Sequence, residues 1–514
     1  MPLQKNQVLT LRVERLSSDG SGVAHSPDGE TVFIPGAAPG DEARVRIVKD
    51  CKRYAFGILD EVLTPSPDRI PVDCAVAGPC GGCSLRHLDY AAELRAKQEN
   101  VADAFARIGG LDVPVLPIVG SPEVNRYRNK VQFPVGVDKS GKPCIGFYAG
   151  RTHRIVPCPD CRLQPGVLNE IGNALCAFFA EKGIQPYSEE TGRGLVRHIF
   201  LRRGAHSGQI MVCLVCTRAK LPSAEELCTR LKAQFAEITT ILLNVNAKNT
   251  NVILGTETHT LYGPGYIEDT LCGVPVQLGP LSFYQVNTLA AEQLYGIAAQ
   301  YAQLTPDDLL LDLYCGMGTI GLSMAAHCRE LIGVEIVPEA IESAKANAAR
   351  MGADVAAKSR FFCADAGQAA TRLAAEGLHP DIVMLDPPRK GCDEATLSAV
   401  VRMSPRRVVY VSCNPATAAR DAAWLENNGY HAEKVQPVDL FPRTKHCECV
   451  IALSKGEIDS KKVRVEFSLE GLDTSGLQKG ATYPEIKARV LEQTGLRVSS
   501  LYISQVKQKC SLEV

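Results

Sequence analysis

Apolar, strand-like runs alternate with helix-like segments between about residues 305 and 455, and this alternation restricts the possible fold more than any other feature of the chain. Strands separated by helical segments predict parallel strands joined by crossover helices, and therefore a doubly wound α/β sheet. The predicted strands span residues 309–313, 331–335, 361–363, 382–386 and 408–412, and the clearest predicted helices span 338–351 and 416–427.

The whole chain has 514 residues, which is enough for three or four domains with a core each. Hydrophobic residues make up 45% and charged residues 22%, as in an ordinary soluble globular protein. The net charge of −1 means that any basic surface must be local. The first eight residues lack the apolar core of a signal peptide, and no run reaches the length of a membrane span. We therefore expect a cytoplasmic protein with no membrane contact.

Residues 1–63 show short alternating runs between Gly, Pro and Asp turns. Five short strands of this kind predict an OB-like β-barrel, although another small β-domain fits the same pattern. Lys49, Lys52 and Arg53 stand beside Tyr54 with a single neighbouring acid. Such a basic segment with an aromatic tip suits contact with a nucleic acid, whereas charge runs of this length are also common on solvated faces.

Residues 64–290 predict an α+β central domain that contains a helix from about Tyr90 to Ile108, with Ile108 on its apolar face. Between residues 126 and 154, seven Lys and Arg side chains face a single acid, which gives a local charge of +6 (seven minus one). Tyr and Phe residues are interleaved among them, as on nucleic-acid-binding surfaces. The predicted RNA or DNA contact consists of Arg126, Arg128, Lys130, Lys139, Lys142, Arg151, Arg154, Arg193, Arg197, Arg202 and Arg203.

Most of the twenty cysteines are expected to be free, small, buried residues of a protein in a reducing compartment. One group is different, because Cys74 precedes the tight pair Cys80-Gly-Gly-Cys83, and Cys158 and Cys161 form a second pair downstream. Four thiolates suit a zinc ion or an iron–sulfur cluster equally well. Cys158 and Cys161 are the two candidates for the fourth position.

A glycine-rich turn, Gly316-x-Gly318-x-x-Gly321, follows the first predicted strand of the sheet and opens a helix. Glu335 ends the next strand, where a carboxylate accepts hydrogen bonds from ribose hydroxyls. A nicotinamide cofactor and S-adenosylmethionine both fit this arrangement. Asp386-Pro-Pro-Arg389, at the end of the fourth strand, resembles the substrate-side motif of nucleic-acid methyltransferases and favours S-adenosylmethionine. Arg389 stands where amino-group methyltransferases have a stacking aromatic residue, which argues against methylation of an exocyclic nitrogen.

Cys413 follows the last predicted strand and precedes Asn414 and Pro415, which should open a helix. This places a thiol at the carboxyl edge of the sheet, where α/β enzymes carry out their chemistry. A thiol is nucleophilic as the thiolate, and a helix that starts at Pro415 favours that form. Glu448 lies downstream and offers a carboxylate as base. Together with Asp386, these residues indicate an enzyme that forms a covalent intermediate.

Seven motifs in the same order make the chain similar to the RNA 5-methyluridine (uracil-C5) methyltransferase family over about residues 5–454. The motifs lie at residues 35–41, 74–83, 283–287, 312–318, 385–389, 412–415 and 446–448. The resemblance implies a TRAM domain in the N-terminal barrel and a Rossmann-like class I methyltransferase domain at 291–455. An accessory extension at 456–514, with a predicted strand at 462–469 and a helix at 483–493, carries no recognisable chemistry.

The resemblance also implies roles for individual residues. Cys413 is expected to be the nucleophile that attacks carbon 6 of uracil, and Glu448 the general base that removes the proton from carbon 5. Thr319, where some members have an asparagine, is left out of the cofactor site. The expected S-adenosylmethionine contacts are Gln285, Tyr314, Glu335, Asp365 and Asp386, and the expected ligands of a structural 4Fe–4S cluster are Cys74, Cys80, Cys83 and Cys161.

The expected partner is RNA, with 23S ribosomal RNA favoured and transfer RNA the alternative, and nothing in the chain indicates an oligomeric state. An iron–sulfur protein whose cluster does the chemistry is a competing hypothesis, but it needs an open coordination site, and four cysteines are present here. A non-catalytic RNA-binding factor is another, against which the intact Cys413, Asp386 and Glu448 argue. A DNA cytosine-C5 methyltransferase shares the thiol chemistry, but its nucleophile normally follows a proline where this chain has Ser412.

Overall fold

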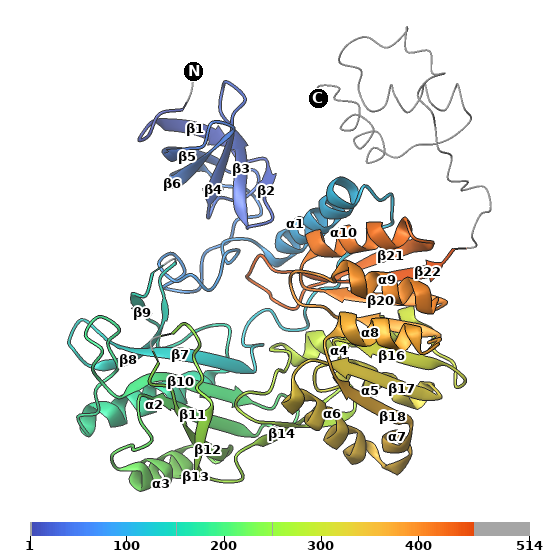
Figure 1. The fold of residues 1–514 in the computed structure, drawn as a ribbon. Helices are drawn as coiled ribbons and strands as arrows, with labels where there is room; N and C mark the ends of the chain where they lie inside the picture. Colours follow the sequence, from blue (N-terminus) through green and yellow to red (C-terminus); the bar gives the residue numbers. More distant parts are fainter. Residues whose placement is uncertain (1–2, 151, 249, 457–514) are drawn as a thin grey trace.

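The computed structural model describes residues 3–150, 152–248 and 250–456. Three bodies of secondary structure follow one another along the chain, namely a small β-barrel, a central sheet with helices on it, and a second sheet between helices (Figure 1). The strand and helix predicted at residues 462–469 and 483–493 lie outside the described residues. No helix within the described part of the chain combines the length and the apolar character that crossing a membrane requires.

The barrel is built from six short strands in the order β1-β5-β6-β4-β3-β2. Strand β5 shows how it forms, because Ala43, Val45 and Ile47 are fully buried while Arg44 and Arg46 between them are exposed. The predicted small barrel is confirmed, with one strand more than the five expected. The strands are β1 (Val8–Arg12), β2 (Arg15–Leu16), β3 (Ser21–His25), β4 (Thr31–Pro35), β5 (Glu42–Asp50) and β6 (Tyr54–Thr64).

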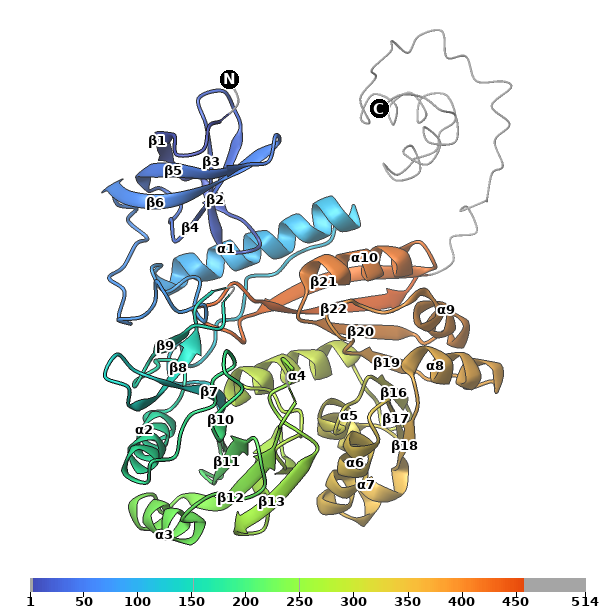
Figure 2. The same cartoon turned by 60° about the vertical axis from the view of Figure 1, so that its left-hand side comes forward.

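Helix α1 (Tyr90–Asp103) follows the barrel in sequence but lies beside the C-terminal sheet in both views (Figures 1 and 2). It ends in a wider, π-helical turn, Ala104–Gly109. Val101 and Phe105 are buried in the same apolar core as the C-terminal strands. Ile108 is 57% exposed, so the predicted apolar face is wrong at its last position. The π-helical turn explains this, because its extra residue per turn rotates Ile108 away from the buried face.

The central sheet has seven strands in the order β13-β12-β11-β10-β7-β8-β9. Helices α2 (Gly166–Glu181) and α3 (Ala224–Gln234) share one apolar core with its strands. Strand β11 is apolar and buried along its whole length, as expected of a strand in the middle of a covered sheet. The strands are β7 (Lys130–Val137), β8 (Pro143–Tyr148), β9 (Ile155–Pro157), β10 (Val196–Arg203), β11 (Ile210–Cys216), β12 (Ile238–Val245) and β13 (Glu257–Tyr262).

The C-terminal sheet has the order β18-β17-β16-β19-β20-β22-β21, and its first five strands are parallel. All five predicted strands are found within two residues of their expected bounds, and the helix predicted at 338–351 is α6 (Pro338–Met351). The parallel strands are β16 (Leu309–Leu313), β17 (Glu330–Glu335), β18 (Ser359–Cys363), β19 (Ile382–Leu385) and β20 (Arg407–Ser412).

Two antiparallel strands extend this sheet beyond its parallel part. Strand β22 (Glu448–Lys455) runs antiparallel to β20 on one side and to β21 (Tyr430–Val438) on the other. The prediction of a wholly parallel sheet is therefore wrong at this edge. The connection of residues 439–447 is too short to contain the crossover helix that a parallel partner of β21 needs, so the chain turns back on itself.

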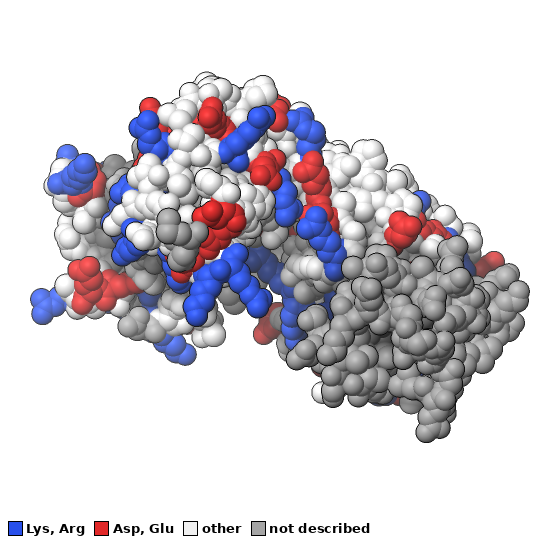
Figure 3. Space-filling model, turned by 90° about the horizontal axis from the view of Figure 1, so that it is seen from above, with Lys and Arg blue, Asp and Glu red and all other residues white. Residues whose placement is uncertain are grey.

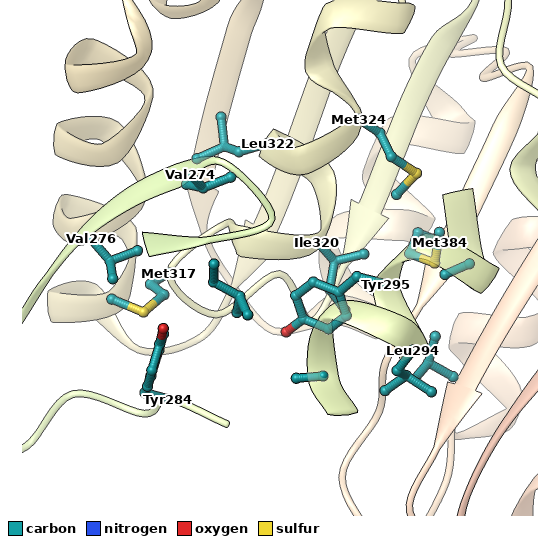
Figure 4. Packing of buried hydrophobic residues seen from close by; sticks show 14 of the residues in the cluster. Val274, Val276, Tyr284, Leu294, Tyr295, Met317, Ile320, Leu322, Met324 and Met384 are labelled. Atoms are coloured by element: carbon teal, nitrogen blue, oxygen red, sulfur yellow. The ribbon is translucent and has the colours of Figure 1, made fainter. Parts of the chain in front are cut away.

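Helices cover both faces of the C-terminal sheet (Figure 2). One face packs against α4, α5 and α6, and the other against α8, α9, α10 and the end of α1. The first face continues into the β14–β15 hairpin, where Val274 and Val276 lie close to Met317 and to residues of α4 and α5 (Figure 4). The remaining elements are β14 (Ile267–Leu271), β15 (Val274–Leu278), α4 (Thr288–Ala302), α5 (Thr319–Met324), α7 (Ala353–Lys358), α8 (Ala366–Ala375), α9 (Glu394–Met403) and α10 (Pro415–Glu426).

Candidate active site

The carboxyl ends of the parallel strands bring most of the predicted site residues to one edge of the C-terminal sheet. Tyr314 follows β16, Glu335 ends β17 and Asp365 follows β18, while Asp386 follows β19 and Cys413 follows β20. Strands β16 and β19 are neighbours in the sheet although they are distant in sequence, so the site lies where the strand order switches direction. The edge therefore has a nucleotide side at β16–β18 and a thiol side at β19, β20 and β22.

Three backbone N–H groups fix the carboxylate of Glu335 on the nucleotide side. Its Oε2 accepts a hydrogen bond from Gly316 at 3.1 Å, and its Oε1 accepts from Ile336 at 2.9 Å and Val337 at 3.0 Å. Gly316 has a left-handed backbone with φ 54°, and no atom lies within 4 Å of the position that a Cβ would take there. Open space therefore borders both the glycine turn and the fixed carboxylate.

The other predicted cofactor contacts of the nucleotide side are held in different ways. Tyr314 is half-buried and has a left-handed backbone with φ 66°. Asp365 caps α8, because its Oδ1 accepts a hydrogen bond from Gln368 N–H at 3.1 Å. Gln285 precedes α4, and its carbonyl oxygen accepts a hydrogen bond from Asn129 Nδ2 at 2.7 Å. The central sheet thus helps to hold the segment that carries Gln285.

The pairing of β20 with β22 places Cys413 beside Glu448. Ser412 pairs with Cys449 in the antiparallel register, so the next position of one strand, Cys413, is opposite the preceding position of the other, Glu448. Helix α10 begins at Pro415, as predicted from the sequence. A thiol and a carboxyl group from residues 35 positions apart (448 minus 413) are therefore adjacent at the start of a helix.

Burial raises the pKa of three groups on the thiol side, namely Asp386, Glu448 and Cys413. It raises the pKa of Asp386 to about 7. Burial, reinforced by the Asp386 carboxylate and opposed by Arg389, raises the pKa of Glu448 to about 8. Burial and the Glu448 carboxylate likewise raise the pKa of the Cys413 thiol, although Arg389 lowers it. The carboxyl groups of Asp386 and Glu448 therefore hold protons near neutral pH more readily than carboxyl groups in water do.

Arg389 is a further candidate functional residue. In the sequence analysis it served only to argue against methylation of an exocyclic nitrogen, because it stands where amino-group methyltransferases have an aromatic residue. Its guanidinium lowers the pKa of both Cys413 and Glu448, against the effect of burial. Its carbonyl oxygen accepts hydrogen bonds from Asn414 Nδ2 at 2.9 Å and Thr417 Oγ1 at 3.3 Å, which ties the loop after β19 to the start of α10. The sequence feature that could have indicated its role is a charged side chain three positions after the Asp386 carboxylate, in a loop that two prolines stiffen.

The cysteines singled out by their spacing line one cavity of about 260 Å³, formed by Cys74, Cys80, Cys83, Cys158 and Cys161 together with the start of β7. Burial raises the pKa of Cys80 and Cys83. A hydrogen bond from Cys158 lowers the pKa of Cys161 to about 6, which makes Cys161 the more readily ionised of the two candidates for the fourth position. Within the described ranges, no three His, Cys, Asp or Glu side chains are placed to hold a metal ion.

Basic side chains also line this cavity, namely those of Arg86, Arg128, Lys130 and Arg162. Arg86 is 3% exposed and donates to Asp73 Oδ1 at 2.7 Å, but its Nε and Nη2 are buried without a hydrogen-bond partner among the described residues. Burial, together with neighbouring Arg202 and Arg128, lowers the pKa of Lys130 to about 8. Part of the basic stretch predicted to contact nucleic acid therefore points into the cysteine cavity.

Two further arginines of the predicted nucleic-acid surface are buried instead of exposed. Arg202 is 1% exposed and donates hydrogen bonds to the carbonyl oxygens of Gly279 and Ser282, both at 2.7 Å. Arg197 is 5% exposed and donates to the carbonyl oxygen of Asn246 at 3.0 Å. The prediction is wrong for these two side chains, because an arginine in a buried strand satisfies its donors on nearby carbonyl groups.

Comparison with known proteins matches residues 207–456 to the tRNA (uracil-5-)-methyltransferase family and residues 2–59 to the TRAM domain. An uncharacterized RNA methyltransferase of Halalkalibacterium halodurans is 43% identical over 453 residues, which cover 88% of this chain and 98% of the relative. One of Listeria monocytogenes is 42% identical over 455 residues, with the same coverage.

Among solved structures, the tRNA (uracil-54, C5)-methyltransferase of Pyrococcus abyssi in complex with S-adenosyl-L-homocysteine is similar with a TM-score of 0.69 and 26% identity. The match covers 87% of this chain and 100% of that one. Three observations point to the same family. They are the motifs at the carboxyl edge of the sheet, the N-terminal barrel, and relatives above 40% identity along nearly their whole length. The chain belongs to the S-adenosylmethionine-dependent RNA uracil-5 methyltransferase family and carries an N-terminal TRAM domain.

Proposed function

We propose that the protein methylates carbon 5 of a uridine in RNA through a covalent adduct between Cys413 and carbon 6. The observation that carries this proposal is the β20–β22 register, which places the thiol of Cys413 beside the carboxyl group of Glu448. Asp386 and Arg389 complete the thiol side of the site from the loop after β19. A nucleophile, a base and a fixed cation are the groups that this chemistry needs.

Cys413 begins the reaction because carbon 5 of uracil is a poor nucleophile. When the Cys413 thiolate adds to carbon 6, the electron pair of the carbon 5–carbon 6 double bond moves into the carbonyl group and forms an enolate. The enolate carbon then takes the methyl group of a sulfonium, whose sulfur keeps the electrons of the broken bond. Arg389 favours the thiolate form of Cys413, since a nearby cation lowers the pKa of a thiol.

Glu448 ends the reaction by removing the proton that remains on carbon 5. The electrons of that carbon–hydrogen bond re-form the double bond to carbon 6, and the carbon–sulfur bond breaks to release the Cys413 thiolate. Once Cys413 is bonded to carbon 6 its sulfur is uncharged. The electrostatic coupling between the thiolate and Glu448 is then lost, which favours the ionised, basic form of Glu448. General-base help of this kind is typically worth about 10²–10⁴-fold in rate.

Gln285, Tyr314, Glu335, Asp365 and Asp386 are the proposed contacts to S-adenosylmethionine, which supplies the electrophilic methyl group when bound. The site fits this group at Glu335, whose carboxylate is oriented by three backbone N–H groups and still has lone-pair capacity for a ribose hydroxyl. Ile336 and Val337 beside it are 61% and 45% exposed, which leaves an apolar surface next to the carboxylate. An adenine ring could cover such a surface.

Replacing Glu335 with alanine is expected to weaken S-adenosylmethionine binding by about 10–100-fold, because a hydrogen-bonded, oriented carboxylate is lost. Calorimetric titration of the full-length protein measures this affinity. Glu330→Ala is the matched control, since Glu330 begins the same strand at the opposite edge of the sheet. Equal affinities of the Glu335 variant and the wild type would remove Glu335 from the cofactor site.

The cysteine cavity is the proposed site of a 4Fe–4S cluster with Cys74, Cys80, Cys83 and Cys161 as ligands. Such a cluster is held by four thiolates, and its sulfur atoms accept hydrogen bonds. The four thiols line one cavity, and the partnerless Nε and Nη2 of Arg86 are buried at its wall. Basic side chains around the cavity would compensate the negative charge of the thiolates. We propose a structural cluster that shapes the RNA-binding region, with no part in the methyl transfer.

Replacing Cys83 with serine is expected to reduce bound iron from about four atoms per chain to near zero and to weaken RNA binding, while S-adenosylmethionine affinity stays unchanged. Iron analysis and calorimetry of anaerobically purified protein measure these quantities. Cys144→Ser is the control, because Cys144 lies in β8 and does not line the cavity. Iron retained in full by the Cys83 variant would contradict the ligand assignment.

The barrel and the central region supply the proposed RNA-binding surface. Lys49, Lys52 and Arg53 are exposed on the barrel, and Tyr54 beside them is 40% exposed and packs edge-on against Phe33. Seen from above, several Lys and Arg side chains lie close together near the centre of the view, with Asp and Glu side chains among them (Figure 3). Exposed cations with an aromatic neighbour suit contact with phosphates and unstacked bases. The target uridine must leave its stack to reach Cys413, at a cost of roughly a few kcal/mol.

Large-subunit (23S) ribosomal RNA is the proposed substrate, supported by the combination of a TRAM domain with the cysteine set, and transfer RNA is the alternative. The Pyrococcus abyssi relative of known structure is named a tRNA (uracil-54, C5)-methyltransferase, so transfer RNA must be tested beside ribosomal RNA. The decisive experiment incubates the full-length protein with methyl-labelled S-adenosylmethionine and either unmodified RNA. Label in 5-methyluridine of one RNA establishes reaction and substrate class together. No label in either, from protein with a full complement of iron, would contradict the proposal.

A further inference from the structure

Four charged side chains form a buried network between helix α1 and the loop that leads to Glu448. Glu93 and Asp439 are 0% exposed, Lys97 is 2% exposed and the Arg443 side chain is 10% exposed. Two cations and two anions balance each other, as burial of charge requires. Burial alone would lower the pKa of Lys97, but the two carboxylates outweigh it and raise that pKa, so the ammonium keeps its charge.

Lys97 uses all three of its N–H donors in this network. Its Nζ lies 2.8 Å from Glu93 Oε1, 2.8 Å from Asp439 Oδ1 and 3.2 Å from the carbonyl oxygen of Phe441. Two of these acceptors belong to residues 439–447, the connection between β21 and β22. The ammonium therefore joins a helix near the N-terminal barrel to the start of the loop that ends at Glu448.

The middle of the same loop is held by the Glu93 carboxylate and by the segment that follows Cys83. Arg443, with a left-handed backbone at φ 68°, donates its N–H to Glu93 Oε1 at 2.7 Å. Its carbonyl oxygen accepts from the N–H groups of Ser84 at 3.0 Å and Leu85 at 3.1 Å. A bulky residue adopts such a backbone only where its surroundings enforce it. The network thus fixes an otherwise unfavourable loop conformation.

The backbone around Glu448 determines where its carboxyl group lies. Within the described part of the chain, no donor hydrogen-bonds to that carboxyl group. Its position follows from β22, which pairs with β20 and, at Glu448 itself, with Val438 of β21, and from the loop of residues 439–447 that joins β21 to β22. An error of about 1 Å in the placement of a reacting group is enough to cost about 100-fold in rate. A distant residue that shapes the loop can therefore act on the step that Glu448 performs.

We propose that Lys97 is a positioning residue for proton removal by Glu448, acting through residues 439–447. The inference rests on the proposed function, because it concerns the step in which Glu448 takes the proton from carbon 5 and the Cys413–carbon 6 bond breaks. Cys413 directly follows β20 and lies outside this loop. Loss of the Lys97 ammonium therefore slows release of the methylated RNA and leaves the preceding methyl transfer nearly unchanged.

The test is a rapid-quench, single-turnover experiment with the full-length Lys97→Gln protein, RNA and methyl-labelled S-adenosylmethionine. Denaturing gels separate labelled RNA that is still bonded to the protein from labelled RNA that has been released. We expect methyl transfer within about threefold of wild type and release slowed at least about tenfold, so that the labelled adduct accumulates. A merely structural role would lower both rates together, or lower the yield of folded protein, with no accumulation of adduct.

Tyr90→Phe is the milder second variant if Lys97→Gln does not fold. It removes the hydroxyl that donates to Asp439 Oδ2 at 3.0 Å and accepts from Ser121 N–H at 2.8 Å. This variant should also accumulate adduct, but less of it than Lys97→Gln. Glu433→Gln is the matched control, because Glu433 pairs with Arg407 at the far end of the same sheet and should release RNA at the wild-type rate.

The outcome also separates this inference from the proposed function. Adduct that accumulates in Glu448→Gln, but in neither the Lys97 nor the Tyr90 variant, would overturn the positioning role and leave the covalent mechanism intact. Absence of adduct in every protein, with no 5-methyluridine formed by the wild type, would instead overturn the mechanism on which the inference rests.

Discussion

Replacing Cys413 with alanine is expected to abolish RNA methylation, with a fall in single-turnover rate of at least about 10⁴-fold. Carbon 5 of uracil gains nucleophilic character only while a nucleophile is bonded to carbon 6. The Cys413 thiol is the group that the β20–β22 register places beside Glu448 for this addition. Label transferred from S-adenosylmethionine to RNA measures the rate, and denaturing gels should show no covalent adduct at any time.

The size of the fall in rate distinguishes a catalytic nucleophile from a thiol that is only buried, because loss of a buried thiol should leave the rate nearly unchanged. Cys228→Ala removes a 9% exposed thiol from α3 in the central region and should retain the wild-type rate. Affinity for S-adenosylmethionine should be unchanged in Cys413→Ala, since the proposed ribose contact, Glu335 at the end of β17, lies three strands away from β20 in the sheet. A Cys413 variant that methylates RNA at more than about a hundredth of the wild-type rate would exclude a covalent mechanism through this residue.

The parallel part of the C-terminal sheet was predictable because each strand is short, apolar and followed by a helical pattern. Strand β16 and helix α6 have the bounds expected from the sequence. Strand β21 was not predicted, because Tyr430–Val438 contains His, Glu, Lys, Gln and Pro and shows no continuous apolar run. Its partner β22 is buried over most of its length, but nothing local shows that it runs antiparallel to β20. Strand direction depends on the length of the connecting loop and on tertiary packing.

The location of α1 could not be read from its own residues either. Its apolar positions show that one face is buried, yet they do not show which sheet covers that face. Val101 and Phe105 pack into the core of the C-terminal sheet across more than 200 residues of intervening chain. Lys97 looks like an ordinary surface charge four residues after Glu93, whereas Asp439 makes both of them buried partners. Contacts of this kind come from topology and carry no local signal.

Individual residues of the candidate site were accessible to sequence reasoning, but their chemical state was not. Strand ends predicted that Asp386 and Cys413 lie at one edge of a sheet, whereas the role of Glu448 came only from the family resemblance. The raised pKa values of all three follow from burial in the folded chain, which depends on helices and loops distant in sequence. Burial was likewise not predictable for Arg197 and Arg202, since a basic stretch of sequence does not reveal which of its side chains point inward.

Replacing Glu448 with glutamine is expected to trap the methylated RNA on Cys413 and to slow its release by about 10²–10⁴-fold, while methyl transfer itself continues. An amide cannot accept the proton from carbon 5, so the carbon–sulfur bond breaks only at the slow rate at which water removes that proton. Single-turnover assays that separate adduct from released RNA measure both steps. Glu433→Gln provides the same chemical change on the same sheet without contact with the site and should release RNA normally. Release at the wild-type rate from Glu448→Gln would assign the base role to another group.

The raised pKa of Glu448, about 8, gives this variant a second signature in its pH dependence. Only the ionised carboxylate can act as base, so wild-type release should quicken as pH rises toward the pKa of Glu448 in the adduct and then level off, whereas the variant should show no such rise. Stability should move the opposite way. Between the ordinary carboxyl pKa, about 4.5, and the native value, the folded state binds the proton more tightly than the unfolded state. The wild-type free energy of unfolding therefore falls as pH rises through this window.

Glutamine removes this linkage because it has no proton to lose. The free energy of unfolding of Glu448→Gln, relative to that of the wild type, should consequently be higher at pH 8.5 than at pH 5 by up to about 4 kcal/mol, as each pKa unit corresponds to about 1.4 kcal/mol. Denaturant titrations at the two pH values measure this difference. A variant that is slower and yet relatively more stable in alkali would show that the same buried carboxyl group destabilises the free protein and drives product release. A difference independent of pH would mean that Glu448 is already ionised at pH 5 in the folded protein.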